Sequence, residues 1–401
     1  MKNIELNTFF DLYPSPYPFD VPDRLSKGFR RVYDLKDEQR LIFPEKRSSK
    51  DKIKDVLIIG SGHTEGIYHA LRNPDLEFTC IDISEKAITS SQENAKQLKL
   101  NNITFENIDF LELKSKTKYD VIYAFNVFQY FDNPSIGFTK CNKLLKDDGA
   151  LIVSVSSSYY FEDIDFIRGL LLDLNYSFDK SEDIKEAFNF VKGLDNFHPS
   201  KIRMVDGDKW INENDFVSRY LIPIHKSYSI YDLFDEISSS NFYFQGWYHN
   251  YLYYPSALLR EKNELHITLF ERISSLSNLD KYDCISKIFR SKNDRFSHTF
   301  CLRKNKEFEF YDNKLLDNEK SIVSLRPYQL IKTHKNQSES FAIISNFQKR
   351  LKVKEHKIAN LVSKPKKISD LLADTSIDLT NDDLKNTLSD LLESSIIFLY
   401  E

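Results

Sequence analysis

The first third of the chain alternates short apolar runs with segments of helical periodicity. Apolar runs of strand length cover residues 56–59, 77–81, 119–125 and 150–156. Behind Ser84, a residue type that caps helices, residues 88, 91, 95 and 98 recur at helical spacing. Strands that alternate with helices require a parallel sheet covered by helices on both faces. We therefore predict an α/β domain over residues 51–175.

Glycines or polar residues stand where the predicted strands end. Gly60 follows the first strand, Asp82 the second and Asn126 the fourth, and a third strand over 103–110 is predicted to end at Asp109 and Phe110. The carboxyl ends of parallel strands form the edge at which α/β sheets bind their ligands. These residues are therefore expected to lie at one site.

The segment from Gly60 to Gly66 joins the first strand to a helix and contains a further glycine at 62. Glycine is needed in such a turn because a Cβ atom blocks both the tight turn and the approach of a ligand. A carboxylate about twenty residues later, here Asp82, is placed to hold the two hydroxyls of a ribose. The pattern predicts an adenosine-type cofactor.

Two cofactors share this geometry, a nicotinamide dinucleotide and S-adenosylmethionine. Glu65 stands where the dinucleotide pattern has glycine, and its carboxylate would face a pyrophosphate of the same sign. S-adenosylmethionine has no phosphate and carries a sulfonium cation, so an acidic turn is harmless to it. The sequence favours S-adenosylmethionine, with the dinucleotide as the alternative.

Residues 50–157 resemble the class I S-adenosylmethionine-dependent methyltransferases. The resemblance rests on the glycine turn, on Asp82, on Ile-Asp-Phe at 108–110 and on Tyr-Asp-Val-Ile-Tyr-Ala-Phe-Asn-Val at 119–127. It implies a Rossmann-like, mostly parallel sheet of seven strands, with the glycine turn at the methionine part and the residues after the later strands at the ribose, adenine and transferring methyl. The residues that it places at the cofactor are Gly60, Ser61, Gly62, Asp82, Ile83, Asp109, Phe110, Asn126 and Val127. The chain departs from the family pattern at Ile58, where an acidic residue is common, and at Thr64, where glycine is common.

Two outer segments resemble one bacterial group of these enzymes. They are the tyrosine- and proline-rich segment 12–19 and the segment 214–230, which runs into Phe-Gln-Gly-Trp at 244–247. The group includes methyltransferases attached to tetratricopeptide repeats and protein-lysine methyltransferases with a regulatory domain. The resemblance implies a methyltransferase that acts on a protein side chain, lysine among them, or on a small metabolite. A catalytically inactive S-adenosylmethionine-binding protein is an alternative, and an NAD-dependent oxidoreductase is another.

The chain of 401 residues exceeds one ordinary hydrophobic core, so several domains are expected. We predict an N-terminal lid over 1–50, an aromatic-rich cap or substrate region over 176–260 and a mainly helical C-terminal domain over 261–401. In the last, helices at 368–373 and 382–393 followed by a strand at 396–400 have the order of a winged helix. The second helix is acidic, which opposes phosphate, so no sequence-specific nucleic acid is expected.

Composition limits the class of protein further. The net charge of −4 argues against general binding to nucleic acid or to a membrane surface, and no signal-peptide or membrane-spanning run is present. The four cysteines are scattered, which is typical of reduced thiols. We expect a cytoplasmic protein without a membrane partner. His298 and Cys301 alone are too few to predict a metal site.

Neither an acceptor nor a catalytic residue is fixed by the sequence. After the fourth strand, Asn-Val-Phe-Gln at 126–129 replaces the Asn/Asp-Pro-Pro-Tyr that marks methylation of nucleobase amines or glutamine amides. The aromatic residues that follow, Phe128, Tyr130 and Phe131, are predicted to wall the acceptor. The candidate bases are His63, His198, His225, Glu162 and Asp163, but no spacing places one of them against an acceptor.

Overall fold

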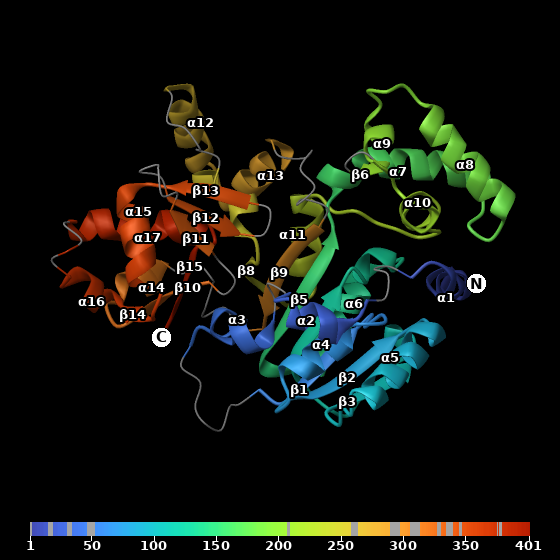
Figure 1. Cartoon of the computed structure of the whole chain (residues 1–401), viewed down its shortest axis with the longest axis horizontal. Helices are drawn as coiled ribbons and strands as arrows, with labels where there is room; N and C mark the ends of the chain where they lie inside the picture. Colours follow the sequence, from blue (N-terminus) through green and yellow to red (C-terminus); the bar gives the residue numbers. More distant parts are fainter. Residues whose placement is uncertain are drawn as a thin grey trace. The chain divides into compact units, whose positions relative to one another are not determined.

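The computed structural model describes two compact units (Figure 1). One comprises Met1–Gly28, Ile53–Asn241 and Phe296–His298, and the other comprises Phe29–Lys52, Phe242–Arg295 and Thr299–Glu401. Each is described by itself below. The described residues are 2–14, 19–29, 34–45, 53–206, 209–257, 264–288, 297–304, 313–326, 330–333, 340–344, 347–374, 376 and 379–401.

The central sheet has seven strands in the order β3-β2-β1-β4-β5-β9-β8, which confirms the predicted α/β class. Neighbours among β3, β2, β1, β4 and β5 pair in parallel, whereas β8 and β9 pair antiparallel. The apolar runs are buried on both faces because helices flank such a sheet, and 121–124 of β4 have no exposed surface. The strands are β1 (Asp55–Ile59), β2 (Glu77–Asp82), β3 (Ile103–Asn107), β4 (Tyr119–Phe125), β5 (Leu145–Ser156), β8 (Tyr243–Trp247) and β9 (Ser297–Arg303).

Side-chain caps start the connecting helices, at Ser84 as the sequence predicted and also at Asn133, which the sequence analysis did not single out. The Ser84 hydroxyl accepts the Ala87 N–H at the start of α5, and the Asn133 side chain accepts the Ser135 N–H at the start of α6. The prediction for β3 was too long, because the Asp109 carboxylate accepts the Leu111 N–H and starts a 3₁₀ helix there. These elements are α4 (Glu65–Arg72), α5 (Glu85–Gln97), α6 (Pro134–Leu144) and the 3₁₀ helices η1 (Phe110–Glu112) and η2 (Phe128–Tyr130).

Strand β5 begins at Leu145, earlier than predicted, and its pairing with β4 is interrupted by a bulge near its start. Tyr119 pairs with Leu145 and the next pair is Val121 with Ala150, so residues 146–149 bulge out of register. The Lys146 ammonium fixes the bulge, since it lies 2.8 Å from Asp120 Oδ2 and 3.1 Å from Asp55 Oδ2. This polar cluster lies at the amino ends of the strands, opposite to the edge that binds ligands.

A helical cap with its own apolar core completes the first unit. Its helices α7, α8, α9 and α10 lie together in Figure 1, and their core includes Leu6 and Phe9 of α1. A capping box formed by Ser229 and Asp232 starts α11. The helices of this part are α1 (Lys2–Leu12), α2 (Val21–Ser26), α7 (Ser158–Asp173), α8 (Ser181–Gly193), α9 (Pro199–Ile202), α10 (Glu213–Tyr220) and α11 (Ile230–Ser239), with the short strands β6 (Val205–Asp206) and β7 (Lys209–Trp210). Of the segment 12–19, residues 15–18 lie outside the described residues.

The second unit contains α3 (Leu35–Ile42) and most of the C-terminal part of the chain. Two buried arginines fasten the segment around α3: Arg303 forms an ion pair with Glu45, and Arg326 Nη2 lies 3.4 Å from Glu38 Oε1. The aromatic run after residue 241 is core, because Trp247 is fully buried and stacks on Tyr253 at 3.8 Å between ring centroids.

The end of the chain contains the predicted helices and strand at close to the predicted bounds. Helix α16 covers Ile368–Leu372, α17 covers Asn381–Glu393 and β15 covers Ile397–Tyr400. The antiparallel sheets β14-β10-β15 and β11-β12-β13 were not predicted. Lys349, in a lysine-rich stretch of the chain, is buried between Glu355 and Ser394. The remaining elements are α12 (Glu264–Ser274), α13 (Asn278–Ile288), α14 (Asn313–Asp317), α15 (Val353–Leu361), β10 (Ile322–Leu325), β11 (Leu330–Thr333), β12 (Ser340–Ile344), β13 (Phe347–Leu351), β14 (Lys366–Lys367) and the 3₁₀ turns η3 (Asn250–Leu252) and η4 (Pro255–Ala257).

Candidate cofactor and acceptor site

The glycine turn after β1 has the backbone geometry that the sequence predicted. Gly60 and Gly62 have backbone φ angles of +66° and +52°, which residues other than glycine rarely adopt. A Cβ atom at Gly60 would lie 2.5 Å from Val127 Cγ2, whereas a Cβ at Gly62 would meet no atom within 4 Å. The turn is therefore closed on the side of Val127 and open at Gly62. The Gly60 and Ser61 amides both donate to the Ile81 carbonyl, which ties the turn to β2.

Asp82 lies at the end of β2 with its carboxylate fixed against this turn. Its Oδ2 accepts the Gly62 N–H and its Oδ1 accepts the Ser84 N–H, both at 2.8 Å. Burial raises the pKa of Asp82 above its usual value, and these hydrogen bonds oppose the rise. Each carboxylate oxygen retains acceptor capacity for a further donor such as a hydroxyl.

Gly66 and Glu65 have roles within the domain that the pattern alone did not show. A Cβ at Gly66 would lie 2.5 Å from Cys80 Sγ and 3.1 Å from Ile103 Cδ1, so this glycine lets α4 pack closely on β2 and β3. Glu65 Oε1 lies 3.0 Å from Nε2 of the buried His69. Gly66 thus serves helix–sheet packing, whereas the family pattern commonly has a glycine at position 64, which is occupied by Thr64 in this chain.

The residues predicted at the adenine and ribose also lie at the carboxyl edge of the sheet. The Asn107 amide, a residue that the sequence analysis did not single out, donates at 3.0 Å to the carbonyls of both Asp82 and Ile83. Phe110 is buried and stacks on Phe131 with 6.3 Å between ring centroids. The rule that site residues stand at strand ends also applies to Asn107, because it is the last residue of β3.

Asn126 and Val127 connect β4 to the 3₁₀ helix η2. The Asn126 N–H donates to the Ser154 carbonyl at 2.8 Å, and the residue has a φ of +54°, a conformation that asparagine tolerates better than most residues. Phe128 is fully buried against Phe138, so this ring supports the loop and does not line it. Tyr130 and Phe131 are partly exposed and remain the predicted acceptor wall.

Helix α1 contributes a carboxylate that the sequence analysis missed. Asp11 Oδ1 accepts the Ser84 hydroxyl at 2.5 Å and the Lys86 N–H at 3.3 Å, at the start of α5. One residue earlier, Phe10 packs edge-to-face on Tyr130 at 5.1 Å. Consequently α1 contacts both the ribose side and the predicted acceptor side of the site. No local pattern relates residue 11 to residue 84.

Two of the candidate bases, His225 and His198, are engaged in hydrogen bonds within the protein. Both ring nitrogens of His225 have hydrogen-bond partners, and His198 accepts the Ser200 N–H at the start of α9. His63 lies in the glycine turn, where burial lowers its pKa below the usual value, and its Nδ1 is buried without a hydrogen-bond partner among the described residues. Glu162 is exposed and Asp163 is half-buried. His298 and Cys301 contact the Tyr228 carbonyl and the Gln245 amide oxygen, respectively.

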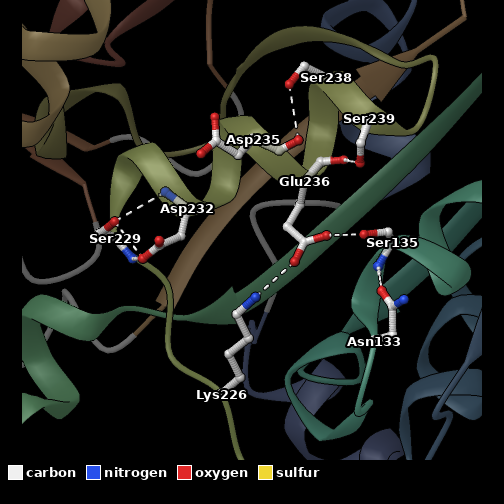
Figure 2. A network of polar contacts seen from close by, with 9 residues as sticks. All are labelled: Asn133, Ser135, Lys226, Ser229, Asp232, Asp235, Glu236, Ser238 and Ser239. Carbon is white, nitrogen blue, oxygen red and sulfur yellow. Dashed lines mark hydrogen bonds and ion pairs between the residues drawn. The ribbon is translucent and has the colours of Figure 1, made fainter.

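A polar network joins α6 and α11 beside this edge (Figure 2). Glu236 accepts the Ser135 hydroxyl at 2.5 Å and the Lys226 ammonium at 2.8 Å. The Lys226 N–H also donates to the Gln129 carbonyl at 2.7 Å. The segment around Lys226 is thereby fixed to the loop that follows β4.

Comparison with known proteins identifies the class of this domain. Residues 50–213 match the family model described as "Methyltransferase domain". This part of the chain is a class I, Rossmann-like methyltransferase domain of the S-adenosylmethionine-dependent type. Among the described residues, no helix has the length and apolar character that crossing a membrane requires.

The particular proteins to which the chain is similar are distant ones. Malonyl-[acyl-carrier protein] O-methyltransferase 2 of Ilyobacter polytropus is 26% identical over 145 residues, which are 35% of this chain. The match spans only about half, 54%, of that relative's length. The solved structure of PKMT2 from Rickettsia typhi has a TM-score of 0.62 at 14% identity, with 96% of this chain and 77% of that chain covered. The same protein in complex with AdoHcy gives 0.61 at 16% identity, with the same shares covered. The fold is thus shared over nearly the whole chain.

Proposed function

We propose that the protein is an S-adenosylmethionine-dependent methyltransferase that methylates a protein side chain, with the lysine amine as the favoured acceptor. The observation that carries the proposal is the meeting of the open turn at Gly62 with the fixed carboxylate of Asp82. The fold likeness to PKMT2, a protein lysine methyltransferase that has been solved with AdoHcy, supports the cofactor and the acceptor.

The residues at this edge suit the cofactor. Gly60, Ser61 and Gly62 present backbone to it, Asp82 has acceptors for its ribose hydroxyls, and Ile83 with Asp109 and Phe110 flanks the adenine position. Asn126 and Val127 follow β4 at the methionine side. When bound, S-adenosylmethionine supplies a methyl group activated by a sulfonium. The protein's part is then alignment of the acceptor, since near-attack placement supplies much of such a rate enhancement.

An amine acceptor does not require a base held by the protein at the reacting atom. The ammonium can lose its proton to solvent before the transfer, and the neutral amine then attacks the methyl carbon through its own lone pair. The partly exposed rings of Tyr130 and Phe131 exclude water around an alkyl amine.

The first test is calorimetric titration of the full chain with S-adenosylhomocysteine and, separately, with NADH. We expect binding of the first alone, weakened about 10- to 100-fold in Asp82→Ala, because a buried charged hydrogen-bond partner contributes about 1.5–3 kcal/mol. Asp183→Ala is the matched control: this carboxylate also accepts a backbone N–H, that of Ser177 at 2.9 Å, but lies in the cap. Binding of NADH alone by the folded protein contradicts the proposed cofactor.

The acceptor class is tested by transfer of a labelled methyl group from S-adenosylmethionine to a cell extract. Separation of the products by size distinguishes protein acceptors from small molecules, and hydrolysis of labelled protein identifies the methylated residue. We expect label in protein as methyl-lysine. Label confined to low-mass products overturns the protein acceptor and leaves the methyltransferase activity standing.

A further inference from the structure

The segment 214–230, whose sequence resembles the bacterial group, returns the chain from the cap to the end of β5. Three of its residues contact that edge. The Tyr228 N–H donates to the Ser156 carbonyl at 2.9 Å, the Lys226 N–H donates to the Gln129 carbonyl, and His225 Nε2 lies 2.9 Å from the Ser156 hydroxyl. The segment therefore joins the end of β5 to the loop after β4.

The hydrogen bonds of His225 define its tautomer. Arg168 Nη2 lies 2.9 Å from His225 Nδ1, and a guanidinium can only donate, so Nδ1 is the acceptor. Nε2 then carries the proton and donates to the Ser156 hydroxyl. Asp165 Oδ1 lies 3.6 Å from Nδ1, beyond hydrogen-bond distance, and is itself bonded to Arg168. His225 is consequently held as a neutral ring.

Arg168 is the anchor of this arrangement. It is 5% exposed, and besides His225 it bonds the Asp165 carboxylate on its own helix α7 and the Arg219 carbonyl at the end of α10. Burial and the adjacent Arg168 also hold the pKa of His225 well below its ordinary value. A second proton on the ring would point at the guanidinium, which would break the link between α7 and β5.

The loop after β4 depends on the same contacts. The Gln129 side chain accepts the Ser156 N–H at 3.2 Å, so Ser156 is held on one side by His225 and on the other by Gln129. The next residue, Tyr130, lies with its ring 6.0 Å from the His225 ring and 5.1 Å from Phe10. Gln129 and the Tyr130 ring are thereby held by residues outside the loop.

We propose that His225 is a positioning residue that, through Ser156 and Gln129, fixes the loop 126–131 and so places Tyr130 at the methyl acceptor. The inference rests on the proposed function only in its last step, that this loop faces an acceptor. Both ring nitrogens are occupied, so His225 acts on the reaction through its neighbours and not as a base. The groups that face it are Phe161, Arg168 and Asp165 of α7, Ser156 of β5 and Tyr130 of η2.

The test is amide hydrogen exchange of residues 126–131, followed by mass spectrometry on the full chain without cofactor. We expect His225→Ala to speed amide exchange in this peptide at least about tenfold. This factor corresponds to a free energy of local opening that is lower by at least about 1.4 kcal/mol. His225→Gln keeps one donor and one acceptor and is expected to stay within about threefold of the native rate. Tyr220→Phe removes a buried hydrogen bond to the Ser200 carbonyl within the cap and is expected to leave this peptide unchanged.

Nitrogen-15 spectra of histidine-labelled protein provide the second readout, because they report which ring nitrogen of His225 carries the proton. We expect the proton of His225 on Nε2, and we expect the ring to stay neutral through the pH range in which an exposed histidine titrates. A proton on Nδ1 at pH 7, or exchange at 126–131 unaltered in His225→Ala, overturns the proposal. If His225→Ala does not fold, Ser156→Ala replaces it, with the same expected exchange. Failure of S-adenosylhomocysteine to bind tests the proposed function separately, since neither readout uses a ligand.

Discussion

One added methyl group tests how closely α4 packs on the sheet. In Gly66→Ala the new Cβ would lie 2.5 Å from Cys80 Sγ, a distance that real Cβ atoms do not show, so the helix or strand has to shift. We expect a loss of about 1–3 kcal/mol in the free energy of unfolding, the usual cost of overpacking a core. Urea unfolding monitored by circular dichroism measures it.

Gly169→Ala is the matched control, because this glycine also lies within a helix, α7, but a Cβ there meets no atom within 4 Å. At such a site alanine is expected to be neutral or to stabilise by up to about 1 kcal/mol, through its better helix propensity. Equal effects of the two substitutions contradict the packing role of Gly66.

At the scale of elements, Ser84 connects the cap of one helix to the docking of another. Its hydroxyl accepts the Ala87 N–H and donates to Asp11 of α1. We expect Ser84→Ala to cost about 1 kcal/mol of stability through the lost cap, and also to speed amide exchange in residues 2–14. Exchange of that peptide, compared with global unfolding, measures both effects.

The control for this change is Ser229→Ala, which removes the cap of α11 in the same unit. It is expected to lower stability by a similar amount without altering exchange in α1. Unchanged exchange of residues 2–14 in Ser84→Ala contradicts the role of Asp11 in holding α1.

The sequence predicted those elements whose limits are set by neighbouring residues. Apolar runs define β1 and β4, and Ser84 and Ser229 start their helices because a side-chain cap is a local interaction. The pattern failed at Asp147, Asp148 and Gly149, whose residue types indicate a turn but which belong to an excursion of β5 held by Lys146. The sequence predicted those site residues that stand at the carboxyl ends of strands. It did not predict Asp11, because this residue reaches the site through the packing of α1 and no sequence spacing reveals that contact.

For the whole molecule, a buried carboxyl group in the second unit predicts a pH-dependent stability. Burial raises the pKa of Glu38 to about 8 against the opposing charge of Arg326, and Glu38 Oε2 is buried without a hydrogen-bond partner among the described residues. Between about pH 4.5 and pH 8 the unfolded chain has therefore released a proton that the folded chain keeps. Folding consequently loses stability as pH rises through this interval, by at most about 1.4 kcal/mol per pH unit.

Glu38→Gln removes this titratable carboxyl group. The free energy of unfolding is therefore expected to fall less between pH 5 and pH 8 than it does in the native chain. Thermal unfolding at several pH values measures the slope, and the transition to follow is the one sensitive to the second unit. A slope equal to that of the native chain shows that Glu38 is ionised in the folded protein throughout the range.

The composition of the two units from separate stretches of chain has a consequence for biosynthesis. Leu35, Leu41, Ile42 and Phe43 leave the ribosome early, yet they are buried in the unit that also requires Thr299–Glu401. During translation these apolar side chains lack the partners that bury them until residues 299–401 have been synthesised. The nascent chain therefore offers a hydrophobic segment to chaperones until residues 299–401 have been made, and a chain that stalls before them carries that segment exposed.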